Sequence, residues 1–262
     1  MTINTALAKG LILASAPFLG LAMAAAPDAA SAAGQNATGT PTHDAPPDAR
    51  TLTAKQQSIP LIAAAMATSD MPQLRNALAR GLDAGLTIKE AREVLVHLYA
   101  YVGFPRSLNA LGELIKVVGE RKQRGMVDVA GSEPSRPVPT GEALLAAGKA
   151  NQTEISGAPV SGPVFEFAPV INEYLQGHLF GAIFERDVID WQSRELATVG
   201  ALAATPGVEA QLRSHMAASM RVGLSPAQLQ QVVELIAKHD NDAGERARSA
   251  LAQARTAFSA AK

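Results

Sequence analysis

The sequence has no cysteine, few aromatic residues and almost no net charge, and each shortage excludes a class of protein. Without cysteine the chain cannot form disulfides or thiolate metal sites, and it cannot carry out thiol-based redox catalysis. With a formal net charge of −1, the chain lacks the excess of positive charge that nucleic-acid binding needs, so no nucleic-acid partner is expected. Aromatic residues make up only 4% of the chain and alanine is abundant, which favours packed helices over a β-sandwich.

The first residues have the pattern of an export signal. A single lysine precedes an apolar run over Leu11–Ala26, which contains an Ala-x-Ala cleavage pattern at 22–24. We therefore predict a signal peptide over 1–24 and an exported, periplasmic protein, with a later cleavage near Ala30-Ser31-Ala32 as an alternative. The alternative is an uncleaved anchor, for which the run is short because a membrane span needs about 20 residues. No later stretch is apolar enough to span a bilayer, so no membrane span is expected after cleavage.

Two segments of the chain align without a gap at an offset of 138 residues. Gln-Leu-Arg recurs at 73–75 and 211–213, and Gly-Leu-Thr at 85–87 matches Gly-Leu-Ser at 223–225. The two segments also share the same positions for helix starts and ends. We interpret this register as a duplicated helical unit.

Each copy is predicted to contain three helices. A glycine suited to a C-terminal cap follows the second helix, and a Thr or Ser with Glu or Gln three positions later forms a capping box before the third. No segment shows the alternation of a half-buried strand over more than a few residues, so the fold class is all-α. The predicted helices span 54–68, 71–83 and 88–102 in the first copy, and 191–204, 208–222 and 226–239 in the second.

Composition divides the chain into five parts. Two stretches have too few large apolar residues to form a core of their own, one before the first copy and one, rich in Pro and Gly, between the copies. The latter contains a short helical stretch at 141–150, and helical periodicity resumes over 165–190. The predicted parts are a signal peptide 1–24, a disordered tether 25–50, a first repeat 51–130, a linker 131–164 and a second repeat 165–262.

Four side chains of the helix predicted over 88–102 could carry acid–base chemistry. Glu90, His97 and Tyr101 are seven and four positions apart, which places them on one stripe of a helix, with Glu93 beside it. A carboxylate, an imidazole and a phenol at a core margin can serve as acid, base and hydrogen-bond donor. The alternative is structural: Glu90 caps the helix, and the others are boundary residues.

The next predicted helix, over 106–121, carries two polar residues near its start. Pro105 can begin this helix, so Arg106 and Asn109 lie in its first turns. Free backbone amides there favour anions, and an arginine can form a bidentate pair with a carboxylate. The alternative is a surface arginine beside a polar cap.

The second copy offers one histidine and an Arg-Glu pair. His215 lies in the middle of a predicted helix on an apolar face, where a histidine is more often a core residue than a catalyst. Arg194 and Glu195 begin the Ala-rich helix, where an ion pair or a surface role is the default interpretation. The histidines, 5 in all, lack the short spacing of a zinc motif, so no metal site is predicted.

The motifs of both copies resemble the carboxymuconolactone decarboxylase-like family. In the second copy they are Arg-Glu-Leu-Ala-Thr at 194–198, Gln-Leu-Arg-Ser-His at 211–215 and Gly-Leu-Ser at 223–225. In the first copy they run from Gly-Leu-Thr at 85–87 through His97 and Tyr101 to Gly-Phe-Pro at 103–105. The resemblance implies an alkylhydroperoxidase-like orthogonal helix bundle. It also implies a homo-oligomer, and the rings of repeats that the family forms suggest a trimer.

The resemblance implies two activities, of which one is closed to this chain. Thiol peroxidase chemistry runs through a Cys-x-x-Cys pair that the sequence lacks. Decarboxylation of a small carboxylated lactone or related acid remains, without a cofactor. His215 would donate the proton, Glu90 or Glu93 would orient it, and Arg194 or Arg106 would hold the carboxylate.

The two copies retain complementary parts of the family pattern. Ala77 in the first copy stands opposite His215, and Gln228 in the second copy stands opposite Glu90. One complete site would therefore have to be assembled across the copies, within one chain or between chains. The alternative function is a binding or assembly module that has kept the scaffold and lost the chemistry.

Overall fold

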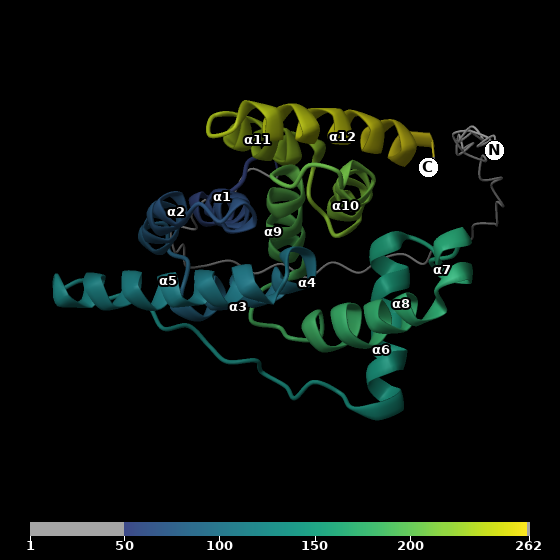
Figure 1. Cartoon of the computed structure of the whole chain (residues 1–262), viewed down its shortest axis with the longest axis horizontal. Coiled ribbons are helices and arrows are strands. Elements are labelled where there is room, and N and C mark those ends of the chain that lie inside the picture. The colour runs from purple at the N-terminus through teal and green to yellow at the C-terminus, as the bar shows by residue number, and fades with distance from the viewer. Residues whose placement is uncertain (1–49, 261–262) are drawn as a thin grey trace, which may run out of the picture. The chain divides into compact units, whose positions relative to one another are not determined.

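The computed structural model describes residues 50–260. The predicted signal peptide and nearly all of the predicted tether lie outside these residues. Every regular element among them is a helix, which confirms the all-α prediction (Figure 1). None of the helices in this part of the chain is long and apolar enough to cross a membrane.

The helices fall into two similar groups with a third group between them. The first group comprises α1 (Ala54–Thr68), α2 (Met71–Asp83), α3 (Ile88–His97), α4 (Tyr99–Val102) and α5 (Phe104–Gln123). The group between comprises α6 (Gly141–Ser156), α7 (Pro163–Phe167), α8 (Pro169–Tyr174) and the π-helix η1 (Leu175–Ile183). The second group comprises α9 (Trp191–Ala203), α10 (Glu209–Arg221), α11 (Pro226–Ala237) and α12 (Asn241–Ala260).

Local sequence signals set the boundaries that the two groups share. The side chains of Thr87 and Ser225 each accept a hydrogen bond from the third residue of the following helix, and both capping boxes are complete. Gly85 and Gly223 have φ of 90° and 99°, a conformation that favours glycine. The helices α2 and α10 therefore begin and end at equivalent positions. The duplication itself stays a prediction.

Three segments differ from the helices that the sequence predicts. The helix predicted over 88–102 breaks at Leu98, where the amide of Tyr101 bonds a carbonyl only three residues back. The helix α6 continues to Ser156, beyond the predicted 141–150. The periodic stretch 165–190 is divided among α7, α8 and η1. Pro169 separates the first two because it has no amide hydrogen to donate.

The two groups share one hydrophobic core. Figure 1 shows α9 between α1 and α10, and both contact it. The closest approach is at Gly200 of α9, where an added Cβ would collide with the backbone of Pro60 in α1. Fully buried side chains from both groups, such as Ile62 and Leu196, belong to the same cluster. Neither group therefore completes its core alone.

The helices between the groups form a second, smaller apolar cluster. It joins Ile155 of α6 and Phe180 of η1 to Ala218 of α10. Gly148 allows α6 and η1 to approach closely, because a Cβ there would collide with the carbonyl oxygen of Gln176. This cluster places a wall of α6 and η1 beside α10.

Candidate functional site

A cleft of about 810 Å³ lies between that wall and the second group of helices. Its lining comes from α4, α6, α7, η1, α9, α10 and α12 and is mostly apolar. Three lining side chains can carry positive charge, namely Arg213, His215 and Arg221. No aspartate or glutamate among the described residues lines it. A volume of this size suits a small organic molecule.

His215 is held in the cleft by a buried carboxylate. Its Nδ1 lies 2.8 Å from Oε2 of Glu195, and the Glu195 side chain is fully buried. The His215 side chain is partly exposed and lines the cleft. The pair therefore fixes the imidazole and leaves Nε2 available to a bound molecule. A base oriented by a third group is the arrangement that acid–base catalysis uses.

Tyr101 of α4 joins His215 from the first group of helices. The two rings meet edge to face with their centroids 5.4 Å apart. The phenolic oxygen of Tyr101 is buried and has no hydrogen-bond partner among residues 50–260. Burial, followed by the nearby charge of Glu195, raises the pKa of Tyr101 far above its usual range. The phenol therefore stays protonated and can donate a hydrogen bond.

His97 lies behind Tyr101 as a neutral, buried imidazole. Thr198 donates its hydroxyl hydrogen to the carbonyl of Arg194, so it must accept one from His97, whose Nε2 is 2.9 Å away. This assigns the proton to Nε2 and leaves Nδ1 of His97 as a buried acceptor without a partner in the described chain. Burial, together with the charge of Arg194, holds the pKa of His97 well below its usual range.

Glu93 binds two arginines at the base of the site. Its Oε1 lies 3.0 Å from Nη2 of Arg194, and its Oε2 lies 2.8 Å from Nη2 of Arg186. Glu93 and Arg194 are fully buried. Burial alone would raise the pKa of Glu93, but hydrogen bonds from Arg186 and the charge of Arg194 outweigh it and lower that pKa. Glu93 is therefore ionised and neutralises these guanidinium groups.

A surface role for Arg194 and Glu195 is wrong, and the ion pair that Arg194 forms is with another residue. Both side chains have an exposed fraction of 0%, and neither pairs with the other. Their helix is covered by α1 and α10, so each needs its own buried partner. Arg194 takes Glu93, and Glu195 takes His215. The sequence reading missed Glu195 and Thr198, although polar residues within an Ala-rich, buried helix were a signal for both.

Three predicted site residues lie elsewhere. Glu90 accepts a hydrogen bond from the amide of Thr87 and pairs with Lys55, as the capping alternative expects. Arg106 is exposed and donates to the carbonyl of Val102, and Asn109 is also exposed. None of the three lines the cleft that contains His215. The helix α3 breaks at Leu98, so the single stripe expected from Glu90 to Tyr101 does not form.

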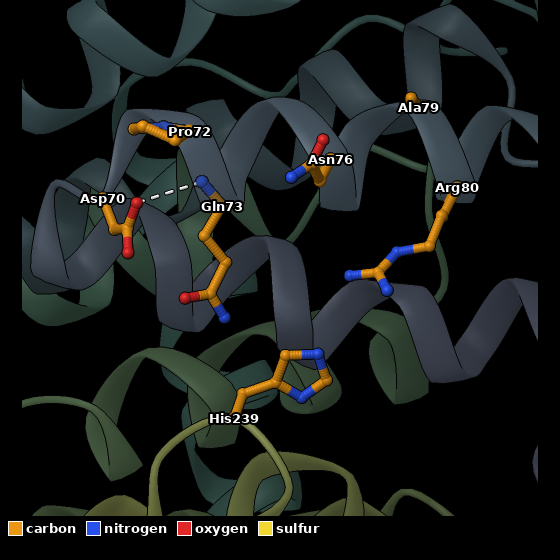
Figure 2. A pocket seen from close by; sticks show the side chains of 7 residues that line it. All are labelled: Asp70, Pro72, Gln73, Asn76, Ala79, Arg80 and His239. Carbon is orange, nitrogen blue, oxygen red and sulfur yellow. Dashed lines mark hydrogen bonds between the residues drawn. The ribbon is translucent and has the colours of Figure 1, made fainter.

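A second cleft, of about 610 Å³, is polar and separate from these residues. Figure 2 shows His239 on one side of it, facing Gln73, Asn76 and Arg80 on the other. Asp70 is occupied as the cap of α2, since it accepts a hydrogen bond from the amide of Gln73 at 3.0 Å. No buried titratable group supports this cleft in the described residues, so it is a weaker candidate for catalysis.

Comparison with known proteins gives a family match within the chain. Residues 169–256 match the Carboxymuconolactone decarboxylase family. This segment is a carboxymuconolactone decarboxylase family domain. It extends from α8 into α12 and includes Arg194, Glu195 and His215. No curated protein sequence matches the chain.

The carboxymuconolactone decarboxylase domain does not hold the whole site by itself. Glu93, His97 and Tyr101 precede the matched segment and come from the first group of helices. They nevertheless contact Arg194, Thr198 and His215 of the domain. Within one chain, the candidate site is therefore built across both groups. The described residues contain no cluster of three or more side chains suited to a metal ion.

Proposed function

We propose that this chain is an acid–base enzyme of the carboxymuconolactone decarboxylase type, acting on a small carboxylated molecule. The observation that carries the proposal is the His215–Glu195 pair at 2.8 Å beside a cleft. The carboxylate on Nδ1 holds the imidazole ring so that Nε2 can exchange a proton with a bound molecule. The proposed reaction is a decarboxylation, which is the lyase activity that the family resemblance implies.

In the proposed reaction, a substrate carboxylate leaves as carbon dioxide. The bond between the carboxylate and its neighbouring carbon breaks, and its electron pair stays on that carbon, delocalised into an adjacent carbonyl. Tyr101 donates a hydrogen bond that stabilises the developing oxyanion. His215 then transfers the proton on Nε2 to the carbon, and water reprotonates the imidazole. The net change is one carboxylate and one proton converted to a C–H bond and carbon dioxide.

The roles assigned to the other residues follow from their burial. Glu195, and not Glu90 or Glu93, positions the histidine. Arg194 is fully buried against Glu93, and Arg106 lies outside the cleft, so neither reaches a substrate there. Arg213 and Arg221 are the guanidinium groups that line the cleft. Glu93, Arg186 and Arg194 act as a buried support for α3 and α9.

The test is turnover of 4-carboxymuconolactone and related lactones by the full chain, followed by mass spectrometry. We expect His215→Ala to lower turnover by 100-fold or more, in line with roughly 10²–10⁴-fold for a general acid. Glu195→Gln should also lower it, because it removes the carboxylate that orients the imidazole. His239→Ala, which changes an exposed histidine, should leave it unchanged. Wild-type turnover in His215→Ala would overturn the proposal.

The second candidate is a binding module without catalysis. Glu93 and Arg194 neutralise each other, so neither is available to react with a substrate. The cleft is also lined mainly by apolar side chains, which favours binding without catalysis. This function predicts ligand binding with no turnover in the wild-type chain. The same mass spectrometry experiment therefore separates the two candidates.

Export and self-association belong to the proposal as well. The apolar run over 11–26 and its Ala-x-Ala pattern support export, and N-terminal sequencing of the protein recovered from its producing cell should begin after residue 24. The exposed apolar residues Phe104 and Leu108, at 62% and 64%, support association of copies into the expected trimer. The molar mass in solution tests that number.

A further inference from the structure

Arg221, the last residue of α10, is a guanidinium without an acidic partner in the described chain. The structure records no ion pair for it within residues 50–260. Its Cζ lies 6.0 Å from the centroid of the Phe258 ring. It also rests against Gly157, where an added Cβ would collide with its Nε. Gly157 and Phe258 therefore contact this guanidinium, and none of the described acidic side chains forms an ion pair with it.

Arg213, the other arginine of the cleft, is already engaged. Its Nη1 donates to Oε1 of Gln253 at 3.2 Å. It also faces a neighbouring cleft whose lining includes the carboxylates of Glu209 and Glu245. Of the two arginines, Arg221 is therefore the one whose charge is unbalanced by nearby acids.

Large apolar side chains line the cleft beside the small ones of α10. Leu175, Leu179 and Phe180 of η1 line it, together with Ile155 of α6. The volume of about 810 Å³ is within the range of roughly 300–1,000 Å³ typical of ligand pockets and exceeds the needs of a single-ring acid. A ligand that fills the cleft needs an apolar body. A ligand that forms an ion pair with Arg221 needs a negative charge.

We propose that the cleft binds a carboxylic acid with an extended apolar body, whose carboxylate pairs with Arg221. The inference deepens the proposed function by naming the class of substrate, and it rests on the same cleft. Positions 215 and 221 are separated by about 9 Å along the helix axis. The carboxylate on Arg221 is thus an anchor, and His215 faces the body of the ligand. Arg221 acts in specificity and not in proton transfer.

The experiment measures binding of decanoate to the full chain at pH 7 by isothermal titration calorimetry. Decanamide, a neutral molecule of nearly the same shape, isolates the contribution of the charge, and acetate isolates the contribution of the apolar body. We expect decanoate to bind at least tenfold more tightly than either. Arg221→Gln should weaken decanoate binding about tenfold, to the level of decanamide, as expected for the loss of a charged hydrogen bond.

Two control variants make the result specific. Arg80→Gln removes the same charge from the other, polar cleft and should bind decanoate like wild type. Arg213→Gln should weaken binding less than Arg221→Gln does. Decanoate binding that is unchanged in Arg221→Gln, with an unchanged thermal melting curve, would overturn the inference. Equal affinities for decanoate and acetate would also overturn it.

The design separates failure of this inference from failure of the proposed function. His215→Ala should lose turnover and keep decanoate binding, because His215 is not the anchor. If wild type turns over no lactone but binds decanoate through Arg221, the inference stands and the catalytic proposal fails. If a lactone is turned over but Arg221→Gln binds decanoate normally, only the inference fails.

Discussion

At the scale of single residues, the site depends on buried charged side chains that each contact a partner. Glu93 faces two guanidinium groups and Glu195 faces one imidazole, and both carboxylates are fully buried. A buried charge is tolerated only where a partner compensates for the lost hydration. Removing one member should therefore lower the free energy of unfolding by more than the intact pair contributes to it.

Glu93→Ala should destabilise the protein by about 3–5 kcal/mol, because it leaves Arg194 buried without a counter-charge. Urea denaturation followed by circular dichroism measures this change. Glu120→Ala removes an exposed partner of Arg75 and should cost far less than Glu93→Ala does. Equal costs for the two variants would contradict the buried pairing.

His97 should make the protein less stable as the pH falls below about 6.5, the usual histidine value. Its pKa in the folded state is lowered by burial, so the unfolded chain takes up a proton there that the folded chain does not. The free energy of unfolding should then fall by up to about 1.4 kcal/mol per pH unit from this residue. This window lies above the range in which Glu93, whose pKa is also lowered, contributes.

The measurement is the pH dependence of the unfolding free energy between pH 7 and 5. His97→Gln should flatten the slope relative to wild type, whatever its effect on total stability. His239→Gln, at an exposed position, should keep the wild-type slope. A His97→Gln slope equal to that of wild type would show that His97 titrates normally in the folded state.

At the scale of helices, the crossing of α1 and α9 depends on one small residue. Gly200 faces the backbone of Pro60, and no flexible side chain lies there to move aside. On α9, the neighbouring residues Val199 and Ala201 are fully buried. A single added methyl group therefore has no space, although alanine is the better helix former.

Gly200→Ala should destabilise the protein by about 1–3 kcal/mol through overpacking. Gly119→Ala, on the exposed side of α5 where nothing lies within 4 Å, should stabilise it by up to about 1 kcal/mol. Thermal melting of both variants is the test. A stabilising Gly200→Ala would mean that the crossing is looser than the structure shows.

At the scale of the whole molecule, the two groups of helices depend on each other. The helix α9 is buried against α1, and their apolar side chains share one cluster. Separation would expose these surfaces to water at a cost of roughly 25 cal/mol per Å². The family match covers α8, η1 and most of the second group, but the folded unit requires the first group as well.

A fragment of residues 165–262 alone should lack a cooperative thermal transition, and so should a fragment of residues 51–130. Co-expression of the two, with the linker helix α6 left on either, should restore a cooperative transition near that of the full chain. Circular dichroism measures both. Cooperative unfolding of the isolated second fragment near the full-chain melting temperature would contradict the shared core.

The sequence alone determined the starts of α3 and α11 and most helices of the two groups, because capping boxes, glycines and apolar spacing act within a few residues. Thr87 and Ser225 began helices where their patterns predicted. The missing cysteines excluded thiol chemistry without any structure. The grouping of His97 and Tyr101 with Arg194 and His215 was also anticipated, as a site assembled across copies.

The tertiary structure decided which of those residues work together. Glu195, for which the sequence favours an ion pair or a surface role, is buried against His215, while Glu90 caps a helix. The pairing of Glu93 with Arg194 joins residues that are 101 positions apart. Such contacts depend on how α3, α9 and α10 cross. Helix crossings are set by packing across the whole core, which local sequence patterns do not encode.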